Sequence, residues 1–250
     1  NRAHANKHPV AHGAGMHHRG MADGHIGIDR VQHALERVLN IFDHLIDDII
    51  LANFDARLLG ARLSIVDLSG GAQPMGLDAE DLWVTFNGEI FNFVELREEL
   101  SAKGHRFSTS SDTEVILHAY REWGVDCVQH FNGQWAFALW DGAQRRMFLS
   151  RDRIGVRPLF YTQLGGKLSF ASEIKALLTQ PEVKAEIDVD ALDEIFTFWT
   201  TIGSRSFFRG IQQLPPGHNM VVTESGLRVT RYWSLSYNPD SRAEAERRGE

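Results

Sequence analysis

Residues 82–90 read LWVTFNGEI, so an apolar run passes directly into an Asn-Gly-Glu segment. The run Leu82–Phe86 is rich in aromatic and β-branched residues, which predicts a strand that ends at Asn87. Gly88 lets a ligand approach the backbone closely, and its N–H and the Asn87 amide are suitable donors to a developing oxyanion. Glu89 is suited to hold the ammonium group of a ligand. When the segment is taken alone, a strand-ending turn with an Asx hydrogen bond is the favoured interpretation.

The chain around this segment alternates short strand patterns with helical ones. Strands are predicted at residues 62–67, and as hairpins at 135–140 with 146–150, 158–162 with 167–171, and 219–222 with 227–232. Helices are predicted over 31–50, 93–103, 111–124, 173–178 and 188–198, with N-caps at Asn92, Ser111, Ser172 and Asp188 and capping boxes completed by Glu95 and Glu114. Because the helices are inserted between hairpins rather than alternating with single strands, the pattern predicts an α+β fold.

Composition excludes several classes of protein. With 250 residues, 43% hydrophobic and 24% charged, the chain is in the globular range and long enough for one large domain or two small ones. Its net charge of -7 argues against binding to nucleic acid or to an anionic membrane. One cysteine, Cys127, cannot form a disulfide framework, which fits a reducing compartment. Since no apolar run approaches the roughly 18 residues of a membrane span, we expect a soluble cytoplasmic protein.

Histidines are concentrated near the start of the sequence. Eight of the 12 precede residue 45. His4, His8 and His12 would align on one face of a helix and could hold a metal ion, but Pro9 interrupts that face and no Cys or carboxylate lies among them. The preferred interpretation is a His-rich tail without a specific metal site.

Further motifs follow one another in a fixed order. They are Arg62–Leu68, Gln73–Met75, Asn87–Ile90, Ser111–Glu114, Phe131–Gly133, Ala136–Asp141, Arg151–Tyr161, Phe170–Leu177 and Leu214–His218. Each is weak alone, and Arg62 or Asp112 by itself is explained by a surface ion pair or by the helix dipole. Together they resemble the glutaminase domain of glutamine-hydrolysing asparagine synthetases, from Ala61 to Leu235.

The resemblance implies a class II glutamine amidotransferase with the N-terminal-nucleophile fold, a four-layer αββα sandwich of two antiparallel sheets. It implies that L-glutamine is the small-molecule substrate. Asn87 and Gly88 would form the oxyanion hole. The other residues implied to contact glutamine are Arg62 at the carboxylate, Glu89 and Asp112 at the ammonium group, and Leu63, Ser64, Ile65 and Val66 along the pocket.

The resemblance also implies an N-terminal cysteine nucleophile whose own α-amine is the base. The sequence begins Asn1-Arg2-Ala3, and no cysteine lies near Gly13–Gly15, where the family spacing would place it. Cys127 has no free α-amine and is interpreted as a small buried hydrophobe. We therefore expect weak or absent hydrolysis. The glutaminase chemistry needs no metal or cofactor, whereas ATP and Mg²⁺ belong to the family's synthetase domain, the partner that receives the ammonia.

These considerations divide the chain into three parts. Residues 1–60 are an atypical His-rich segment, which a frameshift or divergence would explain. Residues 61–234 are the glutaminase domain. Residues 235–250 are a polar linker or stump leading to a missing synthetase domain. Other interpretations are a non-catalytic glutamine-binding or partner-docking module, or a truncated gene remnant. Sugar-phosphate and purine amidotransferases are related, but Arg151–Tyr161 and Leu214–His218 fit the asparagine-synthetase branch better. The formation of a homodimer stays open.

Overall fold

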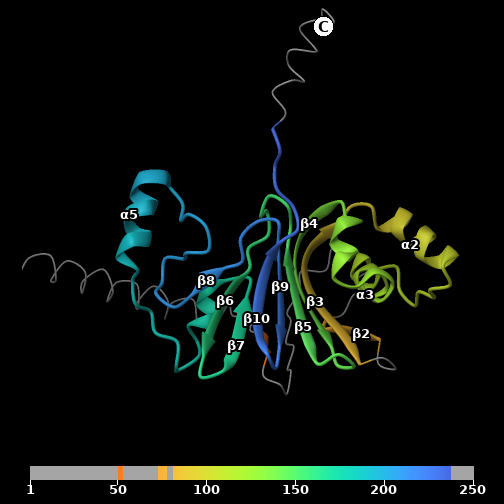
Figure 1. Cartoon of the computed structure of the whole chain (residues 1–250), viewed down its shortest axis with the longest axis horizontal. Helices are drawn as coiled ribbons and strands as arrows, with labels where there is room; N and C mark the ends of the chain where they lie inside the picture. Colours follow the sequence, from red (N-terminus) through yellow and green to blue (C-terminus); the bar gives the residue numbers. More distant parts are fainter. Residues whose placement is uncertain (1–49, 53–72, 78–80, 238–250) are drawn as a thin grey trace, which may run out of the picture. The chain divides into compact units, whose positions relative to one another are not determined.

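The computed structural model describes residues 50–52, 73–77 and 81–237 (Figure 1). The strands are β1 (Ile50–Ala52), β2 (Met75–Leu77), β3 (Leu82–Ile90), β4 (Gly133–Asp141), β5 (Arg146–Arg151), β6 (Phe160–Leu164), β7 (Lys167–Ala171), β8 (Gln212–Gln213), β9 (His218–Thr223) and β10 (Gly226–Arg231). The helices are α2 (Phe93–Ala102), α3 (Asp112–Trp123), the 3-10 helix η2 (Gly124–Gln129), α4 (Ile174–Leu177) and α5 (Val189–Phe198). No helix in these ranges has the length and apolar character needed to cross a membrane.

The strands form two antiparallel sheets. The larger has six strands in the order β10-β9-β5-β4-β3-β2, and the smaller has four in the order β1-β7-β6-β8. The three predicted hairpins are confirmed as β4–β5, β6–β7 and β9–β10. The short strands β1, β2 and β8 were not predicted, because two or three residues are too few to show an alternating pattern.

One helix prediction is wrong at its end. The apolar spacing of residues 31–50 predicted a helix that includes Ile50, but Ile50 begins β1 and pairs with Phe170 of β7. This pairing joins segments far apart in the sequence, so local spacing gives no sign of it. The rest of that predicted helix, and the predicted strand at 62–67, lie outside the described residues.

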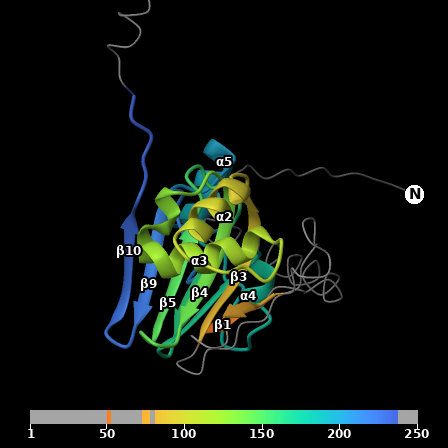
Figure 2. The same cartoon turned by 90° about the vertical axis from the view of Figure 1, so that its right-hand side faces the viewer.

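Three apolar clusters hold four layers together. Helix α3 packs on the outer face of the six-stranded sheet through Val115 and Ile116, which lie in one cluster with Phe148 (Figure 2). A second cluster fills the space between the sheets, where Leu149 of β5 lies with Phe170 of β7. The third joins the four-stranded sheet to α4. The layer order is therefore helix, sheet, sheet, helix, which confirms the predicted αββα sandwich.

Two predicted N-caps are confirmed. The Ser111 hydroxyl accepts a hydrogen bond from the N–H of Thr113 at 3.2 Å, at the start of α3. The Asp188 carboxylate accepts from the N–H groups of Asp190 and Ala191 at the start of α5. Both caps satisfy N–H groups that the helix itself leaves without an acceptor.

The other two predicted side-chain caps do not form, although Asn92 does occupy the N-cap position of α2. The Asn92 side chain does not cap α2: it donates to the carbonyl of His130 at 3.0 Å and accepts from the N–H of Asn132 at 2.8 Å. Ser172 is not the N-cap of α4 either, since Glu173 occupies that position without a side-chain cap bond. In both cases a partner distant in sequence takes the side chain, and local capping rules do not register such partners.

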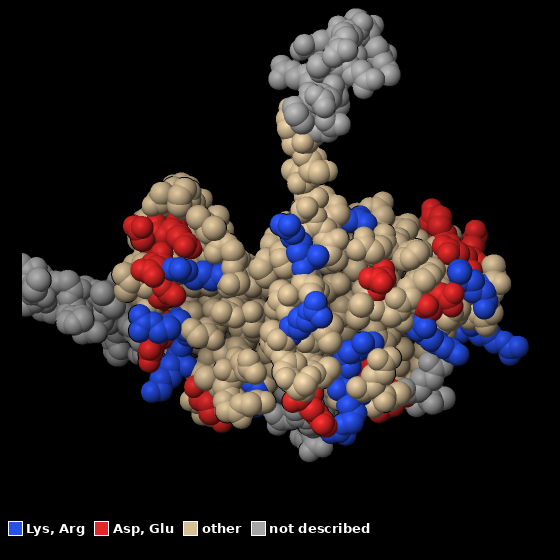
Figure 3. All heavy atoms as spheres, viewed as in Figure 1, with Lys and Arg blue, Asp and Glu red and all other residues tan. Residues whose placement is uncertain are grey.

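The outer strand β10 is an edge of the larger sheet. Arg228 and Arg231 on this strand are exposed, and Figure 3 shows basic side chains over the part of the surface formed by this strand. Charged side chains on an edge strand oppose pairing with the edge of another sheet. The composition of β10 therefore protects the open edge of the sheet.

We predict that Phe148→Ala lowers the free energy of unfolding by about 3–5 kcal/mol, because it empties a fully buried site. The centroid of the Phe148 ring lies 5.7 Å from the ring centroid of Tyr120 and 5.5 Å from that of Phe137. Urea unfolding measures the change. Leu164→Ala is the control, since Leu164 is 42% exposed and its loss should cost no more than about 0.5 kcal/mol. Equal effects of the two substitutions would contradict the assigned core.

Candidate active site

The side chain of Asn87 points toward the second sheet. Side chains alternate between the two faces of a strand, and Val84 and Phe86 of β3 pack in the cluster beneath α3. The residue opposite Asn87 on β4 is Ala136, which belongs to the cluster between the sheets. The Asn87 amide nitrogen Nδ2 donates to the Ser172 hydroxyl at 3.0 Å. Asn87 thus bridges from the six-stranded sheet to the end of β7.

The N–H of Gly88 lies on the open edge of β3. Gly88 is opposite Trp135 on β4, but the N–H and carbonyl of Trp135 both bond to Asp152 on the other side. The pair is therefore one that exchanges no hydrogen bonds across the two strands, and the Gly88 N–H points away from β4. On that edge β2 ends its pairing at Val84.

The N–H groups on either side of Gly88 are occupied by side chains. The N–H of Phe86 donates to Oε1 of Gln73 at 2.6 Å, and that of Ile90 donates to Oδ2 of Asp112 at 3.1 Å. Positions 86, 88 and 90 face the same edge because the strand period is two. Within the described part of the chain, no acceptor bonds the N–H of Gly88. This donor can therefore serve a ligand.

Position 88 accepts only glycine. Its φ is +152°, and a Cβ there would lie 2.1 Å from the carbonyl oxygen of Gln134. An L side chain would require β3 and β4 to separate, which would break the ladder on both sides. The glycine predicted for close approach to a ligand is thus also required by the neighbouring strand.

Asp112 lies beside this edge, at the start of α3. It is 1% exposed, and its Oδ2 holds the N–H of Ile90. The structure therefore brings together Asn87, Gly88, Glu89 and Asp112, which the sequence places in two separate motifs. Glu89 is partly exposed. The role of Asp112 and Glu89 as ligands of an ammonium group stays a prediction.

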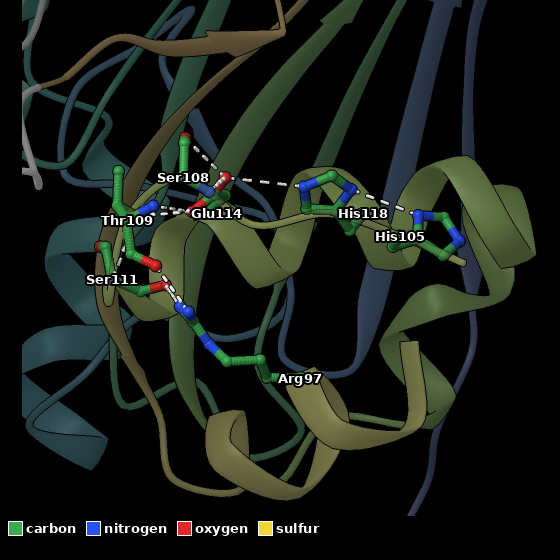
Figure 4. Close-up of polar contacts among 7 residues, drawn as sticks. All are labelled: Arg97, His105, Ser108, Thr109, Ser111, Glu114 and His118. Atoms are coloured by element: carbon green, nitrogen blue, oxygen red, sulfur yellow. Dashed lines mark hydrogen bonds and ion pairs between the residues drawn. The ribbon is translucent and has the colours of Figure 1, made fainter. Parts of the chain in front are cut away.

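Glu114 fixes the loop that leads into Asp112 (Figure 4). Its Oε1 accepts from the N–H and hydroxyl of Ser108, and its Oε2 accepts from the same two groups of Thr109, at 2.7–2.9 Å. The capping box predicted for Glu114 is therefore replaced by bonds to residues before the cap. Arg97 of α2 donates to the carbonyl of Thr109 at 2.6 Å and so holds the loop from the other side.

These contacts settle the charge of Glu114. Burial raises the pKa of the carboxyl, but the hydrogen bonds from Ser108 and Thr109 outweigh this effect, and the pKa is lowered from its ordinary value near 4.5. Glu114 is 2% exposed. A buried carboxylate that accepts four hydrogen bonds is stable in its charged form without a close cation.

The next turn of α3 carries a buried histidine. Nε2 of His118 lies 3.6 Å from Oε1 of Glu114, and Nδ1 of His118 lies 3.2 Å from Nδ1 of His105. Burial lowers the pKa of His118, although the Glu114 carboxylate acts in the opposite direction. His118 is therefore neutral at neutral pH, and the Glu114 carboxylate keeps its hydrogen bonds to Ser108 and Thr109 in the loop before Asp112.

Cys127 does not belong to this site. It lies in η2, between α3 and β4, as the sequence predicted, and it is fully buried. Burial raises the pKa of its thiol strongly, so the reactive thiolate does not form at neutral pH. The interpretation of Cys127 as a small buried hydrophobe is confirmed.

Comparison with known proteins identifies the family of this chain. The profile of a family described as "Glutamine amidotransferase domain" matches residues 15–233, most of the chain. The chain belongs to this family. The match begins at residue 15. The resemblance carried by the ordered motifs begins later in the chain, at Ala61. Asn87, Gly88, Glu89 and Asp112 all lie within the matched glutamine amidotransferase domain.

Curated relatives of this glutamine amidotransferase domain include glutamine-hydrolysing asparagine synthetases. The chain is 44% identical over 177 residues to asparagine synthetase 3 of Bacillus subtilis, covering 70% of this chain and 29% of the relative. It is 35% identical over 207 residues to the putative asparagine synthetase 2 of Methanocaldococcus jannaschii, covering 75% of this chain and 40% of the relative. The chain thus spans well under half the length of these relatives, and the predicted resemblance to them is confirmed.

Two solved structures are similar to part of this chain. One is the glutamine phosphoribosylpyrophosphate amidotransferase of B. subtilis, with 22% identity, a TM-score of 0.45, and coverage of 66% of this chain and 32% of that chain. The other is described as the allosteric regulatory enzyme of purine biosynthesis, with 22% identity, a TM-score of 0.47, and coverage of 68% and 32%. These likenesses concern the fold alone.

Some predicted site residues lie outside the described part of the chain. They are Arg62 and the pocket residues Leu63, Ser64, Ile65 and Val66. The His4, His8 and His12 group also lies outside it, as do all but the first three residues of the predicted linker at 235–250. The roles proposed for these residues stay predictions.

Three residues that support the site were not predicted as site residues, although Ser172 was expected to cap a helix. Gln73 and Ser172 bond to β3, and the fully buried Asp152 accepts from the N–H groups of residues 154–157 and of Trp135. Their only signal was membership of the ordered motifs. An Asp followed by a glycine three residues later could have indicated the local turn, but nothing local links Gln73 or Ser172 to β3.

We predict that Glu114→Gln lowers the free energy of unfolding at pH 7 by roughly 1–3 kcal/mol, because the amide NH₂ would face an N–H donor of the loop. A carboxylate whose folded pKa is depressed stabilises the protein above its unfolded pKa, and this contribution is lost as the pH falls below about 4.5. The difference between wild type and variant should therefore shrink from pH 7 toward pH 3. Urea unfolding at several pH values measures it.

The matched control for this prediction is Glu98→Gln on α2, where the side chain is exposed. Its difference from wild type should stay within about 0.5 kcal/mol at every pH. A Glu114→Gln difference that is independent of pH would contradict the depressed pKa.

Proposed function

We propose that this domain binds L-glutamine and forms the glutaminase part of an asparagine-synthetase-type enzyme. In that reaction glutamine is hydrolysed to glutamate and ammonia. The observation that carries the proposal is the Gly88 N–H, which lies on the edge of β3 between two occupied N–H groups, directly after Asn87 in the chain. The oxyanion of a tetrahedral intermediate requires preorganised donors, and the Gly88 N–H and the Asn87 side-chain amide are the two donors that we assign to it.

The remaining contacts to glutamine are assigned by chemistry and by the resemblance. Arg62 would bind the α-carboxylate, since a guanidinium pairs with a carboxylate through two parallel hydrogen bonds. Glu89 and Asp112 would hold the α-ammonium group, and Leu63–Val66 would line the side-chain pocket. Asp112 would then have two tasks, because its Oδ2 already holds the N–H of Ile90.

The nucleophile does not come from the described residues. The resemblance implies a cysteine whose own α-amine is the base, and the one cysteine of this sequence is the buried Cys127. We therefore propose that the 250-residue chain binds glutamine but hydrolyses it very slowly or not at all, since loss of a nucleophile costs many orders of magnitude in rate.

The ammonia would serve an ATP-dependent amidation of aspartate. The relatives named above are glutamine-hydrolysing asparagine synthetases, and this chain spans 29% of the length of the Bacillus protein. ATP and Mg²⁺ would bind to a synthetase domain, as the family resemblance implies, and neither is needed for the release of ammonia from glutamine.

We predict that isothermal titration calorimetry detects glutamine binding to the 250-residue chain and that Arg62→Ala weakens it at least about tenfold, through loss of the paired carboxylate. Arg228→Ala is the control, because Arg228 is exposed on β10, at the edge of the sheet opposite β2 and β3. Its affinity should equal that of wild type. If wild type does not bind glutamine, the proposal is wrong and the gene-remnant interpretation is favoured.

The matching activity measurement is ammonia release from glutamine. We expect none from the native chain, and release from a variant that begins Cys-Gly-Ile in place of residues 13–15, where the family spacing puts the nucleophile. Binding without turnover by both proteins would instead favour a non-catalytic glutamine-binding module. Turnover by the native chain would show that another nucleophile exists, and Cys127→Ser would be tested first.

A further inference from the structure

The two donors of the candidate oxyanion hole differ in how they are held. Gly88 donates through the backbone, which the β3–β4 ladder and the bonds to Gln73 and Asp112 keep in place. Asn87 donates through a side chain that ends in a broad, two-fold torsion. An amide left to rotate would present its carbonyl oxygen to an oxyanion as often as its NH₂ group. A fixed partner for the Asn87 amide is therefore needed.

Ser172 is that partner. Its hydroxyl accepts from Nδ2 of Asn87 at 3.0 Å, across 85 residues of sequence. An amide nitrogen carries two hydrogens, so this contact uses one and leaves the other directed away from Ser172. Asn87 and Ser172 are both partly buried, and the contact joins the two sheets at the same end as the Gly88 N–H.

The position of Ser172 is itself well fixed. It directly follows Ala171, the last residue of β7, whose side chain packs against α4 in the third apolar cluster. Serine before a helix ordinarily caps it, but α4 begins with Glu173 as its N-cap and without a side-chain cap bond. The Ser172 hydroxyl therefore bonds to the other sheet and makes no bond to the adjacent helix.

We propose that Ser172 is a positioning residue of the oxyanion hole. It holds one hydrogen of the Asn87 amide so that the second hydrogen points, together with the Gly88 N–H, to the oxygen of the substrate amide. The inference rests on the proposed function, since it presumes that glutamine binds at this site. Ser172 itself has no contact with the reacting atoms in this assignment and acts only through Asn87.

The test is the side-chain amide resonance of Asn87 in the ¹⁵N-labelled 250-residue chain, assigned by its loss in Asn87→Asp. In Ser172→Ala we expect hydrogen exchange of this amide to become about tenfold faster, through loss of one hydrogen bond. Ser172→Thr, which keeps the hydroxyl, should restore the wild-type rate. The Asn92 amide, which donates to the carbonyl of His130 at 3.0 Å, is an internal control that should not change.

Saturation with glutamine tests the positioning role. In wild type and Ser172→Thr we expect the Asn87 amide resonance to shift as its second hydrogen meets the substrate carbonyl, and we expect Ser172→Ala to bind glutamine with this shift lost. The same shift in Ser172→Ala would overturn the inference, as would an unchanged exchange rate. A simultaneous change at Asn92 would assign Ser172 a structural role instead and would also overturn it.

This design separates the inference from the proposed function. If the wild-type chain does not bind glutamine, the proposed function falls, and the positioning role falls with it. If wild type binds glutamine and Ser172→Ala leaves Asn87 unaffected, only the role of Ser172 is wrong.

Discussion

The backbone of β3 loses its neighbour β2 after Val84, and the N–H groups that follow on that edge must find other acceptors. Unsatisfied N–H groups in a partly buried strand are costly. Side chains from two other segments, Gln73 and Asp112, satisfy the N–H groups of Phe86 and Ile90. Between them the Gly88 N–H is left for a ligand, so the arrangement that completes the strand also defines the candidate oxyanion hole.

Each supporting side chain is held by a different part of the fold. Asp112 stands at the start of α3, after a loop that the Glu114 carboxylate and Arg97 fix through hydrogen bonds (Figure 4). Asp152 ties β4 to the turn that follows β5, and so holds Trp135 opposite Gly88. The site therefore depends on hydrogen bonds between elements, and the apolar clusters only bring those elements within reach.

Family membership and geometry answer different questions about this chain. The match over residues 15–233 establishes a glutamine amidotransferase domain, and its curated relatives include glutamine-hydrolysing asparagine synthetases. The geometry shows which donors are available and which thiol is not, since Cys127 is enclosed by the core and burial raises its pKa. Together they support a glutamine amidotransferase domain in which the Gly88 N–H is available to a ligand and the one cysteine of the sequence, Cys127, is not available as a nucleophile.

The amino-acid sequence alone determined the hairpins, α3 and α5, because their signals are local: alternation, turn residues, and the caps Ser111 and Asp188. It also predicted Asn87, Gly88, Glu89 and Asp112 as site residues, chiefly through the resemblance that the ordered motifs carry. It predicted side-chain capping bonds at Asn92 and Ser172 that do not form, and it left Gln73 and Asp152 without a role. Only the tertiary structure decided these, because each of the four residues has a partner 13 to 85 residues away along the chain. Whether a polar side chain bonds to a local or to a distant partner is decided only when the sheets have packed.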